Sequence, residues 1–304
     1  MTEAHVSEER PIWRRIVDFP LVAMVFAILL YAFATAFAVQ LGKLVPPIGA
    51  IGTAAAHAII AVGLVFAVYK LAIARLGERP RDDLPARRAV TNLGLGLAAG
   101  FVIFSAVVGV AAVADVYNIS GCCSTRELAM NLITVAIVPA FMEELLFRGI
   151  LFRWIEEFGG SWAALIVTSA LFGLAHIFNP NATWFASFAI AVEAGVLLGA
   201  AYMLTRSLWM PIGLHAAWNF TQGFIFDVPV SGINQEGLVD ASLSGPELLS
   251  GGTFGLEASV IALVIATAVG VWLVVLAVRR GELMQPWWVR RRKQLDDPLA
   301  QTFA

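Results

Sequence analysis

The sequence Met142-Glu-Glu-Leu-Leu-Phe-Arg148 decides the fold, because it places three charges inside an apolar run that begins near Leu128 and continues past Trp154. A charged side chain at the centre of a membrane-spanning helix costs roughly 2.5 to 3.5 kcal/mol on insertion scales. Two adjacent carboxylates in such a run must therefore face a partner or water, and a functional site is the default expectation.

Helical spacing divides the three charges into a pair and a single group. Glu144 and Arg148 are four residues apart, so they lie on one helix face and can form an ion pair. Glu143 lies roughly 100° around the helix from Glu144 and can point elsewhere. Pro139 removes a backbone hydrogen bond just before the acids, which predicts a kink or a loosened turn there. We interpret Glu144–Arg148 as a supporting pair and Glu143 as the carboxylate that is free to act.

The composition predicts an all-α membrane protein that crosses the bilayer several times. Of the 304 residues, 59% are hydrophobic and 14% are charged, and the mean hydropathy is +0.80. Soluble domains are about 45–50% apolar and about 25% charged. A membrane-spanning helix needs about 20 apolar residues. Eight spans are expected, at residues 20–42, 51–71, 93–113, 128–147, 162–178, 184–204, 209–226 and 258–278.

The chain divides into a polar N-terminal segment (1–18), a helical bundle (19–280, whose core at about 128–220 is expected to hold the functional site) and a basic, aromatic tail (281–304). The first apolar run is too long for a signal peptide and is interpreted as a retained span. With the N-terminus in the cytoplasm, 18 of the 20 Lys and Arg residues, Arg148 among them, fall on cytoplasmic flanks. This asymmetry predicts a multi-pass protein, expected in a bacterial plasma membrane, with both termini in the cytoplasm.

Three segments outside the spans are informative. The tail at residues 285–293 joins two tryptophans to a basic cluster, which indicates either an anchor for anionic lipid headgroups or a plain topogenic signal. Residues 227–257 carry acids, no bases and many Gly and Ser residues, and are expected to form a mobile external loop without assignable chemistry. Cys122 and Cys123 are the two cysteines, too few for a disulfide framework. They are interpreted as small apolar loop residues, with metal or redox use left open.

Two of the four histidines, His176 and His215, are candidate site residues. His176 follows Phe172 by four residues, and His215 precedes Asn219 by four, so each pair shares a helix face. His5 lies in the polar N-terminus, and His57, alone among alanines in the second span, is interpreted as a core or helix-contact residue.

Helix geometry allows these residues to meet. Glu143 and His176 are 33 residues apart, and Gly159-Gly160 falls midway between them. If the helix of Glu143 runs on to Phe158 and the next returns from Ser161, each leg is about 24 Å long at 1.5 Å per residue. The two side chains then face each other at equal depth, which predicts a polar site in the cytoplasmic half of the bundle.

One pocket would then collect Glu143, Glu144, His176, His215 and Asn219. A carboxylate can deprotonate water while the imidazoles and the amide polarise a carbonyl and protonate a leaving amine, so the set suits hydrolysis. The sequence contains no Gly-x-Ser-x-Gly, His-Glu-x-x-His or Walker motif that would favour another chemistry. Two histidines and a carboxylate (His176, His215 and Glu143) could also hold a metal. A polar contact that only locks three helices together is the structural alternative.

At these residues the sequence resembles the CaaX prenyl endopeptidase type II and bacteriocin-processing (CPBP, or Abi) family of intramembrane proteases. Three family motifs occur in order: Glu-Glu-x-x-x-Arg at 143–148, Phe-x-x-x-His at 172–176 and His-x-x-x-Asn at 215–219. The resemblance covers about residues 128–220, roughly a third of the chain.

The resemblance implies that Glu143 activates the water with help from Glu144, and that Arg148 holds Glu144. It implies that three further motif residues bind a metal or form an oxyanion site: His176, His215 and Asn219. Phe172 is implied to be a packing residue. The family has been described both as metal-dependent and as a glutamate-type protease. We favour the glutamate–water mechanism, with a divalent metal such as zinc as the alternative.

The expected function is therefore an intramembrane endopeptidase that cuts a membrane-associated or lipid-modified peptide, with the lipid bilayer and no nucleic acid as partners. A non-catalytic immunity or regulatory protein on the same scaffold is the alternative. A small transporter that uses the buried acids is a third possibility, and the chain shows no inverted repeat that would favour it. Glu193, in the sixth span, is an additional buried acid that could line the cavity, pair with a cation or face a neighbouring helix.

Overall fold

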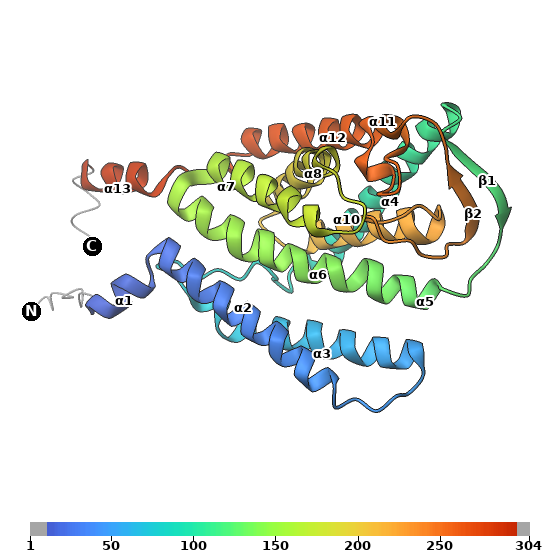
Figure 1. The fold of residues 1–304 in the computed structure, drawn as a ribbon. Coiled ribbons are helices and arrows are strands. Elements are labelled where there is room, and N and C mark those ends of the chain that lie inside the picture. Colours follow the sequence, from blue (N-terminus) through green and yellow to red (C-terminus); the bar gives the residue numbers. More distant parts are fainter. Residues whose placement is uncertain (1–10, 297–304) are drawn as a thin grey trace, which may run out of the picture.

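A computed structural model describes residues 11–296, which form a mostly helical bundle with one small sheet (Figure 1). The helices are α1 (Ile12–Val17), α2 (Pro20–Gly42), α3 (Ala50–Leu71), α4 (Ala89–Val113), α5 (Leu128–Asn131), α6 (Val138–Glu144), α7 (Arg153–Ala175), α8 (Trp184–Ile190), α9 (Val196–Thr205), α10 (Trp209–Phe220), α11 (Glu247–Ser250), α12 (Val260–Arg279) and α13 (Trp287–Asp296). The strands are β1 (Tyr117–Cys122) and β2 (Val239–Leu243). His5 and the outer parts of both expected terminal segments lie outside the described residues.

Short irregular helical turns join several of these helices. The π-helical turns are Leu132–Ile137, Leu145–Phe152, Ala191–Gly195 and Thr221–Ile225, and the 3-10 turns are Ile73–Arg75, His176–Phe178 and Leu256–Ala258. Two π-helical turns flank α6, the short helix that carries Pro139 and both acids. The loosened helix expected beside Pro139 is therefore present.

The described residues contain six helical stretches long and apolar enough to cross a membrane, so the expectation of eight is not met. They are Pro20–Gly42, Ala50–Arg75, Ala89–Val113, Leu128–Phe178, Trp184–Thr205 and Val260–Arg279. Two expected spans fall within Leu128–Phe178, whose chain reverses direction at Gly160. The expected span at 209–226 has twelve residues of α-helix and five of π-helix. It reaches only about 25 Å, short of the roughly 30 Å hydrocarbon layer.

The reversal depends on Gly160, which has φ 84° and ψ 169° between two helical legs. Only glycine adopts such a conformation without strain. A Cβ at Gly160 would also lie 2.9 Å from the carbonyl oxygen of Met284. The backbone N–H of Ser161 donates to that same carbonyl at 3.0 Å. The turn expected at Gly159-Gly160 is thus present, and the segment after α12 packs against it.

The segment at residues 227–257 is a folded part of the protein, contrary to the expectation of a mobile loop. It contains α11 and β2, which pairs antiparallel with β1 and has an irregular register between Ile119 and Gly121. Val228, Phe254 and Leu256 are buried. Because such burial removes apolar surface from water, the segment packs as part of the bundle.

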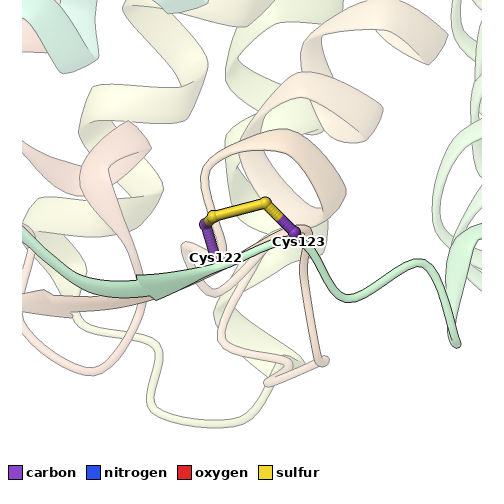
Figure 2. The surroundings of a disulfide bond; sticks show 2 residues. All are labelled: Cys122 and Cys123. Atoms are coloured by element: carbon purple, nitrogen blue, oxygen red, sulfur yellow. A yellow bond between two sulfur atoms is a disulfide. The ribbon is translucent and has the colours of Figure 1, made fainter.

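Cys122 and Cys123, at the end of β1, form a disulfide between adjacent residues (Figure 2). Cys123 has a positive φ of 84°, and its N–H donates to the carbonyl of Leu238 in the segment before β2. The interpretation of these cysteines as two small apolar side chains is therefore wrong, because the sulfur atoms are bonded to each other. His57 matches its interpretation as a helix-contact residue, since Nε2 lies 3.0 Å from the carbonyl oxygen of Gly42.

Helices α4 and α10 approach closely because glycines face each other between them. A Cβ at Gly96 or Gly100 would clash with backbone atoms of α10, and a Cβ at Gly213 would clash with α4. Small residues let membrane helices pack at backbone distance. This contact fixes the position of α10, the helix that carries His215 and Asn219.

We expect Gly100→Ala to lower the melting temperature in detergent, because the added methyl group would meet the carbonyl of Leu214. Overpacking of this kind typically costs about 1–3 kcal/mol. Gly109→Ala on the same helix is the matched control, since nothing lies within 4 Å of a Cβ there. This control should be neutral or slightly stabilising. Equal melting temperatures for the two variants would contradict the close packing.

Candidate functional site

Glu144 and Arg148 form a fully buried ion pair inside the bundle. Arg148 Nη1 donates to Glu144 Oε1 at 2.8 Å, as their spacing predicts. Arg148 Nη2 also donates to the carbonyls of Ala194 and Gly195, at 3.4 and 3.3 Å, in a π-helical turn. The charge asymmetry of the sequence places Arg148 among the Lys and Arg residues on cytoplasmic flanks of the spans. This placement is wrong, because Arg148 is buried inside the bundle. Because it neutralises an internal carboxylate, it lies at the depth of that acid.

His215 connects the two acids. Its Nδ1 lies 3.0 Å from Glu144 Oε1, and its Nε2 lies 4.0 Å from Glu143 Oε2. Because a carboxylate only accepts hydrogen bonds, Nδ1 carries the hydrogen that is donated to Glu144. The Nε2 atom therefore faces Glu143, either as an acceptor or, in the imidazolium form, as a second donor.

Glu143 is the more accessible of the two acids. Its side chain is 33% exposed, whereas that of Glu144 is fully buried. Glu143 Oε2 has no hydrogen-bond partner within the described part of the chain. Tyr31 of α2 lies beside this position, since its hydroxyl donates to the carbonyl of Met142 at 3.1 Å. Oε2 itself is buried and faces His215, so the exposure of this side chain belongs to its other atoms.

Phe172 packs between the cationic and imidazole groups of the site. The guanidinium carbon of Arg148 lies 4.6 Å from the Phe172 ring centroid, a favourable cation–π arrangement. The rings of His176 and His215 lie 4.7 and 6.1 Å from the same ring. His176 Nδ1 lies 2.7 Å from the carbonyl oxygen of Phe172, so Nδ1 donates and Nε2 is left for other contacts.

Asn219 is held by the helix irregularity at Pro139. Proline has no N–H to donate to the carbonyl of Val135, four residues earlier. This carbonyl instead accepts a hydrogen bond from Asn219 Nδ2 at 3.0 Å. The break in the helix of the two acids thus supplies the acceptor that orients Asn219 of α10.

A cavity of about 30 Å³ lies beside these residues. It has room for two or three water molecules, at about 10–15 Å³ each. The polar residues that line it are His176, His215, Asn219, Ser231 and Glu257. The structure thus brings three of the five expected site residues to one cavity, while Glu143 and Glu144 contact it through His215.

Glu257 and Ser231 were missed by the sequence reasoning. They belong to the segment that was expected to be an external loop, and neither has a partner at helical spacing that would have signalled a site. Glu257 is buried and accepts a hydrogen bond from the backbone N–H of Ser231. Burial raises the pKa of the Glu257 carboxyl from its ordinary value near 4.5 to about 7.

Glu193 faces the interior without pairing with a cation. It is fully buried, and neither carboxyl oxygen has a hydrogen-bond partner among the described residues. It does not line the small cavity, although it interacts electrostatically with Glu257, which does. A buried carboxyl without a hydrogen-bond partner is costly to ionise.

The side chains do not form a metal-ligand cluster. In their neutral forms, both site histidines would offer an Nε2 lone pair of the kind that metals bind. Within residues 11–296, however, no group of three or more His, Cys, Asp or Glu side chains is arranged to hold a metal ion. The set proposed for zinc, His176, His215 and Glu143, therefore does not fit a metal in this arrangement.

Replacing Arg148 by Met should destabilise the protein, because Glu144 would remain buried without its cation. Removing one partner of a buried pair costs about 3–5 kcal/mol, whereas replacing both is often nearly neutral. The double variant Glu144→Gln/Arg148→Met should therefore recover much of the loss. Thermal unfolding in detergent measures both effects. Equal melting temperatures for the single and double variants would argue against a buried ion pair.

Replacing Glu257 by Gln should stabilise the protein at pH 8 and change little at pH 4. A carboxyl with a raised folded-state pKa contributes full stability below about pH 4.5 and loses it as the pH rises toward 7. The difference between the two pKa values corresponds to at most about 3.5 kcal/mol. Melting temperatures across this pH range test the effect. Glu247→Gln, an exposed acid of the same segment, is the control and should show no such pH-dependent gain.

Comparison with protein families identifies one match. The model of the family described as type II CAAX prenyl endopeptidase Rce1-like matches residues 125–221. This range contains the Glu-Glu-x-x-x-Arg, Phe-x-x-x-His and His-x-x-x-Asn motifs, and the match confirms the resemblance that those motifs indicated. Comparison with curated proteins and with solved structures yields no significant match.

Proposed function

We propose that this chain, an integral membrane protein whose residues 125–221 match the type II CAAX prenyl endopeptidases, hydrolyses a peptide bond with a water activated by Glu143. The observation that carries the proposal is the contrast between the acids. Glu144 is fully buried and paired with Arg148, whereas the Glu143 side chain is 33% exposed, forms no pair with Arg148 and has its buried Oε2 atom 4.0 Å from His215 Nε2.

The net charge of the buried groups indicates that His215 is protonated. Glu143, Glu144 and Arg148 together carry one net negative charge, which is unfavourable inside a membrane bundle. A proton on His215, held between both carboxylates, makes the group neutral. His215 is then a hydrogen-bond donor on both ring nitrogens.

The reaction follows from these positions. Glu143 removes a proton from the water as its oxygen attacks the scissile carbonyl carbon. His215 donates its Nε2 proton to the leaving amine when the C–N bond breaks, and Glu143 then returns a proton to His215. The second amide hydrogen of Asn219 stabilises the oxyanion, since the first is bonded to Val135.

The substrate is a membrane-associated or lipid-modified peptide, because the site is built from helices that are otherwise apolar enough to lie in lipid. The charge asymmetry, which holds for 17 of the 20 Lys and Arg residues once the buried Arg148 is left out, favours both termini in the cytoplasm, and we place the chain in a bacterial plasma membrane. The described chain ends lie at the same end of the bundle, as such a topology requires (Figure 1). The site would then open toward the cytoplasmic half of the bilayer.

Glu143→Gln should abolish cleavage of a quenched-fluorescent membrane peptide in proteoliposomes while leaving the melting temperature unchanged. The amide keeps the shape of the side chain but cannot take a proton, and loss of a general base costs about 10²- to 10⁴-fold. The control is Glu127→Gln, an acid that precedes α5 on the same leg and lies 3.8 Å from Arg126. Full activity in the Glu143 variant would remove this residue from the base role.

A further inference from the structure

A second and larger cavity, of about 930 Å³, lies at the end of the bundle where α1 and α13 are found. Residues of α1, the start of α2, residues 78–81 and the segment leading into α13 line it. It is separate from the candidate active site, because the two cavities share no residue. Ligand pockets typically have volumes of about 300–1,000 Å³.

This cavity lies at the level where membrane spans end. Pro20, the first residue of α2, lines it, and its α13 wall follows a few residues after α12 ends at Arg279. Trp287 lines it and makes an edge contact with Phe19 at 6.0 Å. Tryptophan is enriched at the interface between lipid and water. The cavity therefore lies at the expected depth of lipid headgroups.

The charge of the cavity is positive. Five arginines line it, Arg15, Arg79, Arg81, Arg290 and Arg291, against three acids, Asp18, Glu78 and Glu157. Arg15 and Arg79 form no ion pair within the part of the chain that the structure describes. A free anion would find guanidinium groups, which bind phosphate oxygens with paired hydrogen bonds.

Arg290 shows that this positive charge is not fully compensated. Its Nη2 donates to the carbonyl of Glu157 at 2.6 Å, but its buried Nε has no partner among the described residues. Burial, followed by the positive charge of Arg79, lowers the pKa of the Arg290 guanidinium. A bound anion between Arg79 and Arg290 would offset their repulsion.

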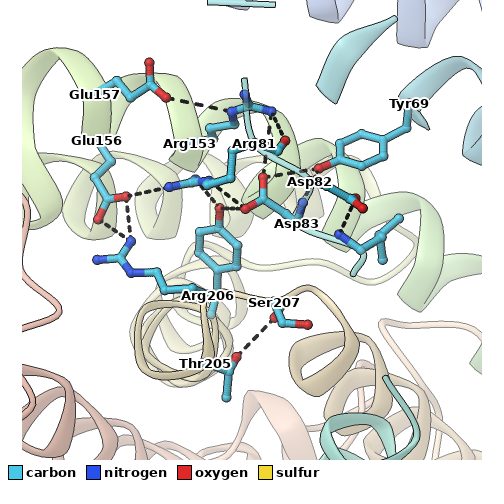
Figure 3. A network of polar contacts seen from close by, with 12 residues as sticks. Tyr69, Arg81, Asp82, Asp83, Arg153, Glu156, Glu157, Thr205, Arg206 and Ser207 are labelled. Atoms are coloured by element: carbon cyan, nitrogen blue, oxygen red, sulfur yellow. Dashed lines mark hydrogen bonds and ion pairs between the residues drawn. The ribbon is translucent and has the colours of Figure 1, made fainter. Parts of the chain in front are cut away.

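One wall of the cavity is held in place by a buried polar network (Figure 3). Arg81 Nε lies 2.7 Å from Asp83 Oδ1, and Arg153 Nη1 donates to the carbonyl of Arg81 at 2.9 Å. Glu156, on the same helix as Arg153, pairs with Arg206 at 2.7 Å. These contacts fix residues 78–81 against α7, so the wall exists before a ligand binds.

We propose that this cavity binds the phosphate headgroup of an anionic phospholipid. Arg79 and Arg290 bind the phosphate, and the apolar side chains of α1 and Trp287 contact the glycerol region. The basic tail then forms one wall of a specific lipid-binding site and is more than a general basic anchor. This proposal does not depend on the proposed peptidase activity.

The test uses the full-length protein in detergent with added short-chain phosphatidylglycerol, phosphatidylcholine or glycerol 3-phosphate. Phosphatidylglycerol should raise the melting temperature saturably, phosphatidylcholine should not, and free glycerol phosphate should give a much smaller effect. Arg79→Gln/Arg290→Gln should weaken phosphatidylglycerol binding by about tenfold or more. The control Arg279→Gln/Arg280→Gln removes two exposed arginines near the same end of the bundle. It should change the affinity for phosphatidylglycerol by less than about twofold.

Three outcomes would overturn the proposal: no shift with phosphatidylglycerol, an equal loss in both double variants, or a full shift with glycerol phosphate alone. If the Arg79/Arg290 variant does not fold, Arg79→Glu at an exposed position gives the same test. A variant without residues 1–10 tests the alternative that the acidic N-terminal segment, and not a lipid, binds in the cavity. A lipid shift that is seen only in this truncated variant would also reject the proposal, because the chain itself would then occupy the cavity.

Discussion

The buried ion pair between Glu144 and Arg148 is the interaction on which the candidate site depends. Burying either charge alone would be costly, and further hydrogen bonds compensate part of the cost of burying the pair, although Glu144 Oε2 and Arg148 Nε have no hydrogen-bond partner among the described residues. Arg148 reaches the carbonyls of Ala194 and Gly195, and Glu144 accepts from His215. One ion pair therefore joins three segments of the chain and sets the position of the imidazole that faces Glu143.

Irregular helices supply the acceptors that these polar side chains need. A regular helix uses its carbonyls internally, so it offers few acceptors to neighbouring helices. Pro139 leaves the carbonyl of Val135 available to Asn219, and a π-helical turn presents the two carbonyls that Arg148 contacts. The irregular turns thus allow a polar site to form between helices that are otherwise packed through small and apolar residues.

The site separates a sealed part from an accessible part. Glu144, Arg148 and the Phe172 ring are buried and hold their neighbours in place, whereas Glu143 retains contact with the exterior. The segment at 227–257 contributes to the enclosure of the site, because Ser231 and Glu257 line the small cavity together with the site histidines. Access to Glu143 and closure around the cavity are the two conditions that controlled hydrolysis of a peptide within a membrane requires.

The sequence by itself determined the features that depend on local spacing and composition. These include the helical membrane fold, the Glu144–Arg148 pair and the turn at Gly160, since residues four apart on a helix must share a face. The tertiary structure alone decided which helices are long enough to span a bilayer, and that Asn219 bonds to Val135. It also brought Glu257 to the cavity and joined the adjacent cysteines, contrary to expectation. The contacts of Asn219 and Glu257 depend on how distant segments pack, which no local pattern encodes, whereas the disulfide depends on the backbone conformation at two neighbouring residues.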